Sequence, residues 1–132
     1  NDDTRCTFHG ELHDKSELIR ILDAGDVLLC PSHSEGMPNV IMEGMARGLA
    51  VIATDVGATS LLVDEQNGTL LPEARPSQLL ELFERYESAS LLEKKRNSLK
   101  RIANFTFPAI AFQLICKLKL VALRSVKSKE EE

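Results

Sequence analysis

Two short, almost wholly apolar runs, at residues 26–30 and 49–53, constrain the fold of this chain more than any other feature. Pro31 ends the first run, and Gly48 precedes the second. Runs of this length and composition are typical of strands that are buried on both faces of a parallel sheet. We therefore expect two strands here, joined by the helical segment that lies between them.

Two other segments have strand-like patterns. Residues 6–9 alternate between apolar and polar side chains and then meet Gly10, which predicts a short strand followed by a turn. Residues 68–71 form another short run, which ends at Pro72. Four strands are therefore expected, whereas doubly wound nucleotide-binding domains usually have about six. The chain also opens at Asn1 without a methionine, and we expect the remaining strands to precede it in a longer protein.

Helical patterns separate these strands. Asp14 and Glu17 have the spacing of a capping box, and the apolar positions that follow predict a helix that ends near Gly25. Further helices are expected at about residues 38–48, 61–63, 76–86, 91–105 and 109–126. Strands that alternate with helices at these spacings imply βαβ units. We predict an α/β, Rossmann-like fold in which residues 1–126 form part of a domain and residues 127–132 form a charged tail.

Charge and cysteine content exclude several classes of protein. A net charge of −4 argues against a nucleic-acid-binding protein, which would normally present a basic face. Cys6, Cys30 and Cys116 are odd in number and widely spaced in apolar surroundings, which predicts reduced core thiols and no zinc site. No signal peptide opens the chain, and the apolar stretch at 109–123 is too short and too charged to span a bilayer.

The segment from residue 31 to residue 48 carries the chemistry. Its first part, residues 32–37, is a loop that leaves the end of a buried strand, where α/β proteins bind ligands. The loop leads into a helix whose free N–H groups and dipole favour an anion such as a diphosphate. Gly36 allows the backbone to approach a ligand closely. The sequence therefore predicts an anion site at the start of this helix.

Two carboxylates flank that anion site. Glu35 lies in the loop, and Glu43 lies about 6 Å along the helix from Asn39. A nucleotide sugar has hydroxyl groups on both sides of its diphosphate, so this spacing suits it. Another interpretation stays open, because Asn39, Glu43 and Arg47 could form a solvated stripe in which Glu43 pairs with Arg47. Glu35 could likewise be a loop carboxylate without a ligand, and His33 is interpreted as a surface histidine.

The same residues form a recognisable signature. Glu35 and Glu43 stand as E-x7-E inside the run Pro31-Ser32…Glu35-Gly36-Met37-Pro38-Asn39…Glu43-Gly44-Met45-Ala46…Gly48. This run resembles the donor site of retaining GT-B glycosyltransferases of the family 4 type. The resemblance extends in order along nearly the whole chain, through Phe8-His9-Gly10, Ala24-Gly25-Asp26-Val27, Val51 to Gly57, Asn67-Gly68 and Phe105-Thr106-Phe107.

The resemblance implies a role for each matching position. Glu35 would be the catalytic carboxylate and would contact hydroxyls of the donor sugar, and Glu43 would contact the ribose. Backbone N–H groups near Gly36, Met37, Asn39 and Val40 would hold the sugar and the diphosphate, and Glu11 and Leu12 would lie beside the base. The resemblance implies no metal or other cofactor, since members of the family work without a bound metal, and the donor, a UDP- or GDP-sugar, is a substrate. The implied reaction is retaining transfer to a glycan or lipid-linked acceptor, as in polysaccharide biosynthesis.

The chain also departs from the family pattern. Ala58, Ser60 and Leu61 stand where the family usually has a glycine and then a proline-glutamate pair. The basic pair that binds the diphosphate and the N-terminal acceptor domain would lie upstream, so we expect the isolated chain to transfer no sugar. A nucleotide-sugar 2-epimerase-like enzyme and a non-catalytic nucleotide-sugar-binding domain remain alternatives.

Two expectations concern the surroundings of the protein. The reduced cysteines predict a cytoplasmic location, either free or peripheral at the inner face of the membrane. The apolar helix at 109–123 is expected to be packing surface, and its exposure in a lone chain predicts self-association.

Overall fold

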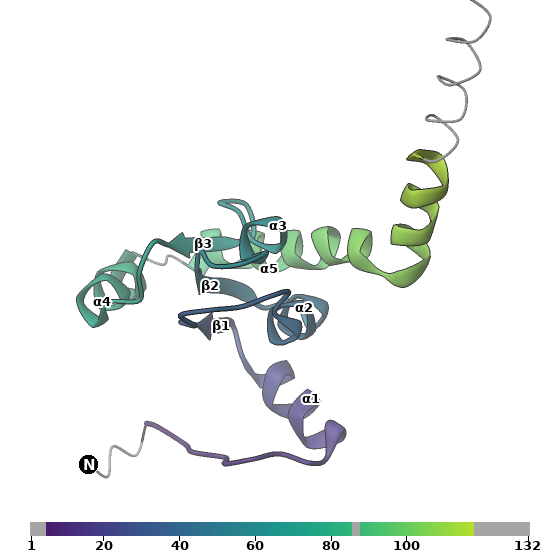
Figure 1. The fold of residues 1–132 in the computed structure, drawn as a ribbon. Helices are drawn as coiled ribbons and strands as arrows, with labels where there is room; N and C mark the ends of the chain where they lie inside the picture. Colours follow the sequence, from purple (N-terminus) through teal and green to yellow (C-terminus); the bar gives the residue numbers. More distant parts are fainter. Residues whose placement is uncertain (1–4, 86–87, 118–132) are drawn as a thin grey trace, which may run out of the picture.

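The computed structural model describes residues 5–85 and 88–117 and contains a three-stranded parallel sheet (Figure 1). The strands are β1 (Val27–Cys30), β2 (Ala50–Thr54) and β3 (Gly68–Leu71), in the spatial order β1-β2-β3. Register pairs include Val27 with Ala50 and Val51 with Gly68. The α/β fold and three of the predicted strands are thus confirmed.

The centre of the sheet is the centre of the core. All five residues of β2 are buried, because this strand has a neighbour on each edge and packed side chains on its faces. Helix α2 (Asn39–Ala46) and helix α5 (Ser88–Ile102) pack against β2 and against each other. The buried apolar cluster consists of Cys30, Ile41, Met45, Val51, Ala53, Leu62 and Val63.

The fourth predicted strand, at residues 6–9, is wrong. These residues are exposed and run as an extended segment apart from the sheet (Figure 1), and the side chain of Phe8 is 94% exposed. A strand requires a neighbour to complete its backbone hydrogen bonds, and none of the described strands lies beside this segment. Cys6 is exposed for the same reason, so the prediction of a core thiol fails here, whereas Cys30 is buried.

Helix α1 (Lys15–Ala24) begins at the predicted cap. The Asp14 carboxylate accepts hydrogen bonds from Ser16 N at 2.8 Å and from Ser16 Oγ at 2.7 Å, and these bonds lower the pKa of Asp14. The capping box is incomplete, since the side chain of Glu17 makes no return bond to Asp14 within the part of the chain that the structure describes. The helix ends at Gly25 as predicted.

Apart from β3, the described elements after residue 55 are helical. They are α3 (Thr59–Leu62), α4 (Pro76–Arg85), α5, the short 3₁₀ turn η1 (Ala103–Phe105) and a further helical stretch at 107–117. The break between the last two helices comes at η1, because Pro108 is tolerated in the first turn of a helix. The predicted end of the last helix, at residue 126, and the predicted tail, 127–132, lie outside the described residues.

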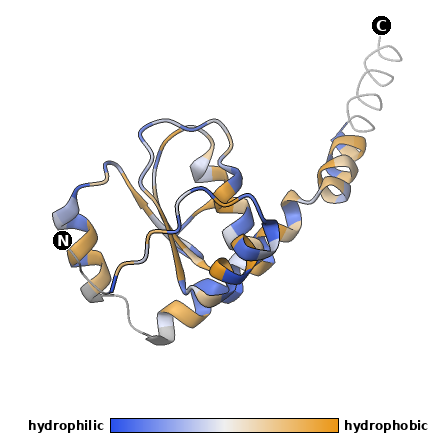
Figure 2. Cartoon of the chain, turned by 90° about the horizontal axis from the view of Figure 1, so that it is seen from below, coloured by the Kyte–Doolittle hydropathy of each residue, from blue (hydrophilic) through white to orange (hydrophobic). Residues whose placement is uncertain are grey.

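The helical stretch at 107–117 leaves the body of the protein, and Figure 2 shows it as a mostly apolar rod. Phe107 is 87% exposed, Phe112 is 68% exposed, and Ile110, Leu114 and Ile115 are each about half exposed. Within the described residues, no helix is long and apolar enough to cross a membrane.

Candidate functional site

The loop between β1 and α2, residues 31–38, lies at the carboxyl edge of the sheet. Parallel strands end at the same edge, so the loop that leaves β1 lies beside the end of β2. Two contacts fix it there: Thr54, the last residue of β2, donates from Oγ1 to the carbonyl oxygen of Ser32, and Cys30 Sγ lies 3.5 Å from Ser32 Oγ. The loop therefore lies where ligands bind in open α/β sheets.

The N-terminus of α2 presents free hydrogen-bond donors. Pro38 is the N-cap residue, and no side chain caps the first turn. The backbone N–H groups of Gly36, Met37, Asn39 and Val40 donate to no acceptor among the described residues. Together with the helix dipole, these four groups form a region of positive potential suited to an anion.

The two carboxylates next to these donors are also free. Glu35 is half-buried in the loop and Glu43 is exposed on α2, and neither side-chain carboxylate forms a hydrogen bond or ion pair with another described residue. Arg47 does not pair with Glu43. Its Nε and Nη2 lie 2.5 and 2.6 Å from the carboxylate oxygens of Asp23 on α1, and this hydrogen-bonded pair lowers the pKa of Asp23. The interpretation of Glu43 as the partner of Arg47 is therefore wrong, whereas Asn39, Glu43 and Arg47 are all exposed, as expected for a solvated stripe.

Glu43 lines a cavity between α1 and α2. The cavity has a volume of about 260 Å³, and its walls are mostly apolar, with Leu18, Ile19 and Leu22 from α1. Lys15, at the start of α1, and Arg47 of α2 are the other charged residues that line this cavity. An apolar wall beside a free carboxylate and a free ammonium group suits a ligand with one flat apolar part and hydroxyl or phosphate groups.

The structure brings some of the predicted site residues together and leaves others apart. Gly36, Met37, Asn39 and Val40 surround the start of α2, as described above. Glu35 precedes them in the loop but does not line the cavity that contains Glu43. Glu11 and Leu12 lie in the segment before α1 and do not line it either. The side chain of Glu11 is 84% exposed and lies 4.0 Å from that of His13.

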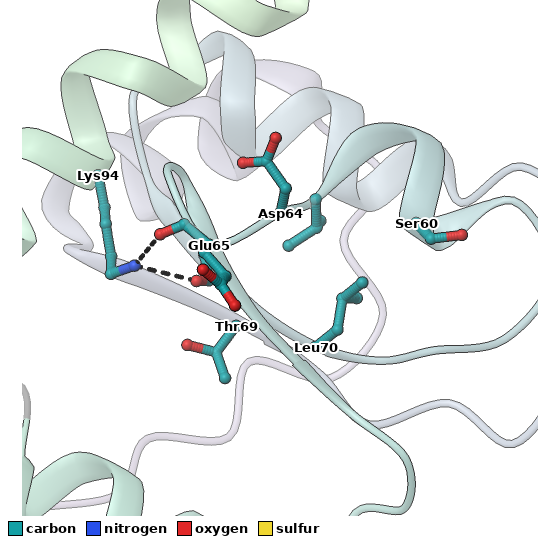
Figure 3. Close-up of a pocket in the computed structure, with 8 residues that line it drawn as sticks. Ser60, Asp64, Glu65, Thr69, Leu70 and Lys94 are labelled. Atoms are coloured by element: carbon teal, nitrogen blue, oxygen red, sulfur yellow. Dashed lines mark hydrogen bonds between the residues drawn. The ribbon is translucent and has the colours of Figure 1, made fainter.

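A larger cavity, of about 490 Å³, lies beside β3 and is drawn in Figure 3. Lys94 of α5 reaches across it and donates to the backbone carbonyls of Glu65 and Gly68, and Asp64 on its wall is paired with Arg101. These polar groups hold the connection between α3 and β3 onto α5. We assign the candidate site to the start of α2 because its donors and carboxylates are free.

Sequence reasoning missed three residues that contribute to the site. Lys15 lines the cavity with Glu43, and Thr54 and Ala58 each donate a hydrogen bond to the loop. The sequence shows Ala58 only as a departure from the family pattern. It does not show the contact of Ala58 with the loop, because that contact joins residues about twenty positions apart.

Comparisons with known proteins point to one family. The family model described as "Glycosyl transferases group 1" matches residues 1–86. The TuaC protein of Bacillus subtilis (strain 168), named as a glycosyltransferase of teichuronic acid biosynthesis, is 41% identical over 64 residues, which are 48% of this chain and 16% of TuaC. A D-inositol 3-phosphate glycosyltransferase of Corynebacterium diphtheriae is 30% identical over 101 residues, which are 74% of this chain and 24% of the relative. This chain thus spans a quarter or less of either relative.

Two solved structures share the fold. Sucrose-phosphate synthase of Thermosynechococcus elongatus superposes with a TM-score of 0.74 at 28% identity, over 92% of this chain and 31% of that protein. The C-terminal domain of LpcC, a glycosyl transferase group 1 family protein of Francisella tularensis, superposes with a TM-score of 0.69 at 28% identity. That match covers 77% of this chain and 54% of the LpcC domain.

Proposed function

This chain belongs to the group 1 glycosyl transferases, whose GT-B, Rossmann-like fold it shares, and we propose that it forms the donor-binding part of a retaining enzyme of the family 4 type. The donor is a UDP- or GDP-sugar, and the acceptor is a glycan or a lipid-linked glycan. One observation carries the proposal: four N–H groups at the start of α2, and the carboxylates of Glu35 in the preceding loop and Glu43 in the helix, have no partner among the described residues. A nucleotide sugar offers an anion for the donors and hydroxyl groups for the carboxylates.

The proposed roles follow from the chemistry of each group. The N–H groups of Gly36, Met37, Asn39 and Val40 bind the diphosphate and the sugar, and the helix dipole stabilises the charge that develops on the leaving diphosphate. The Glu35 carboxylate accepts hydrogen bonds from the donor sugar.

The nucleoside is proposed to occupy the cavity between α1 and α2. There the Glu43 carboxylate accepts hydrogen bonds from the ribose hydroxyls, and the apolar side chains of Leu18 and Ile19 contact the flat face of the base. The Lys15 ammonium group lies on the same cavity and can approach the nucleotide phosphate. Glu11 and Leu12 remain proposed neighbours of the base, which requires the segment before α1 to fold toward the cavity when the nucleotide binds.

Loss of Glu43 is expected to weaken nucleotide binding. The Glu43→Ala change removes charge-assisted hydrogen bonds to the ribose, so we expect the Kd to rise by about tenfold to a hundredfold. Ligand-observed NMR of the chain with UDP, GDP, ADP and their sugar conjugates measures this and identifies the base. Glu93→Ala, which removes an exposed carboxylate from α5, is the matched control. Equal affinities for the Glu43→Ala and Glu93→Ala variants would contradict the assignment of Glu43.

We propose that the exposed apolar helix at 107–117 pairs with the same helix of a second copy of the 132-residue chain. Apolar side chains as exposed as Phe107 and Phe112 gain free energy by mutual burial. Static light scattering is expected to give a mass that rises above 14.6 kDa with concentration and falls back in a Phe112→Glu variant. A monomeric mass at all concentrations would overturn the proposal.

The proposed location is the cytoplasm, either free or peripheral at the inner face of the membrane. The three cysteines are free thiols in the described part of the chain, which supports a reducing compartment.

A further inference from the structure

The turn after β2 packs directly against the site loop. Gly57 has a φ of 58°, and a Cβ atom at this position would lie 1.9 Å from the carbonyl oxygen of Glu35 and 2.9 Å from that of Gly36. The next residue, Ala58, donates its backbone N–H to the Gly36 carbonyl at 2.9 Å. Thr54 also donates to the carbonyl of Ser32, so the carbonyls of Ser32, Glu35 and Gly36 all face residues 54–58. We call residues 54–58 the brace.

The brace determines where the loop N–H groups point. In a trans peptide the C=O and N–H bonds point in opposite directions, and no cis peptide occurs among the described residues. The Glu35 carbonyl faces Gly57, so the N–H of Gly36 points away from the brace. The Gly36 carbonyl accepts from Ala58, so the N–H of Met37 also points away from it. Neither N–H has an acceptor among the described residues.

We propose that the brace is a positioning element that aims the N–H groups of Gly36 and Met37 at the donor's diphosphate or sugar. This inference rests on the proposed function for its ligand, but the orientation itself follows from the contacts above. Gly57 is suited to the role for two reasons: its backbone is left-handed, and it leaves the Glu35 carbonyl in van der Waals contact with the turn. Any side chain at this position would push the loop away and rotate its peptide planes.

The test measures backbone orientation directly. Residual dipolar couplings of the N–H groups, recorded on the 132-residue chain, report the directions of the Gly36 and Met37 bonds relative to the sheet. We expect Gly57→Ala to change these two couplings while the couplings of β2 and α2 keep their wild-type values. Gly48→Ala is the matched control, since Gly48 also has a positive φ, of 75°, but its Cβ would meet the side chain of Leu99, at 3.4 Å, and not the loop.

A second readout is affinity for the free nucleotides UDP and GDP. We expect Gly57→Ala to raise the Kd by about tenfold or more and Gly48→Ala to change it by less than about twofold. If Gly57→Ala does not fold, Thr54→Val and Thr54→Ser replace it: the valine variant loses the hydroxyl that holds Ser32, and the serine variant keeps it. Altered loop couplings in the valine variant that return to wild-type values in the serine variant support the proposal.

The outcomes separate the brace from the donor site. The proposed role of the brace is overturned if the Gly36 and Met37 couplings keep their wild-type values in the Gly57→Ala variant. The same holds for the Thr54→Val variant if it replaces Gly57→Ala. Either result counts even if the wild-type chain binds a nucleotide. Altered couplings in a chain that binds neither UDP nor GDP support the brace as an orienting element and count against nucleotide binding by this chain.

Discussion

Replacing Gly68 with alanine is expected to lower the free energy of unfolding by about 3 kcal/mol, the upper end of the usual cost of overpacking. The added Cβ would lie 2.2 Å from the carbonyl oxygen of Val51 and 2.7 Å from Val63 Cγ1. Val51 belongs to the central strand, and Val63 is fully buried. Relief of the clash would have to separate β3 from β2, because the backbone of β2 is hydrogen-bonded on both sides.

Urea unfolding followed by circular dichroism measures this effect. Gly36→Ala is the matched control, since a Cβ at Gly36 meets no atom within 4 Å. Its stability is expected to stay within about 0.5 kcal/mol of the wild-type value. Equal midpoints for the Gly68→Ala and wild-type chains, with equal slopes, would show that β3 can shift freely and that the sheet is less tightly packed than the contacts around Gly68 indicate.

The strands at 26–30, 49–53 and 68–71 were predictable because each is a short apolar run between turn-forming residues. For such a run, burial in a parallel sheet is the arrangement that hides its side chains and satisfies its backbone at the same time. β2 illustrates this, since Ala50 to Thr54 are all buried. The crossovers followed from the same pattern, because parallel strands need a helix or long loop between them.

Residues 6–9 have a strand pattern but do not form a strand, and the reason lies outside the pattern. Alternation records which side chains could face a core; it does not supply the neighbour that a strand needs. Phe8 therefore remains exposed. The placement of Pro108 inside a helix was missed for a different reason, because proline is compatible with the first turn of a helix as well as with a break.

The candidate site was predictable as far as local sequence determines it. The succession of strand, loop and helix predicted that Gly36 and Asn39 lie at the start of a helix, and the structure has this helix start. The pairing of side chains was not predictable from spacing. Arg47 is four residues from Glu43, but its partner is Asp23, twenty-four residues away, because the fold brings the Asp23 carboxylate of α1 within hydrogen-bond distance of the Arg47 guanidinium. That pairing leaves Glu43 free for a ligand.

Converting Glu35 to glutamine is expected to reduce kcat for sugar transfer by about 10²–10³-fold. The assay requires a protein that carries this chain together with an acceptor-binding domain, since we propose that the chain alone transfers no sugar. Glutamine keeps the shape of the side chain but loses the charge that strengthens hydrogen bonds to the sugar hydroxyls. These bonds strengthen as the sugar becomes oxocarbenium-like, and each 1.36 kcal/mol lost at that stage costs a factor of about ten.

Glu43→Gln is the informative comparison for Glu35→Gln. The ribose hydroxyls lie far from the bond that breaks, so they are bound equally well before and during the reaction. Loss of the Glu43 charge should therefore raise KM and leave kcat within about threefold of the wild-type value. The two carboxylates of the same signature then have separable kinetic effects, one on kcat and one on KM. If the Glu35→Gln enzyme instead keeps its kcat and loses affinity for the donor, Glu35 binds the donor equally well in the ground state and in the transition state. Another residue would then have to stabilise the reacting sugar in the transition state.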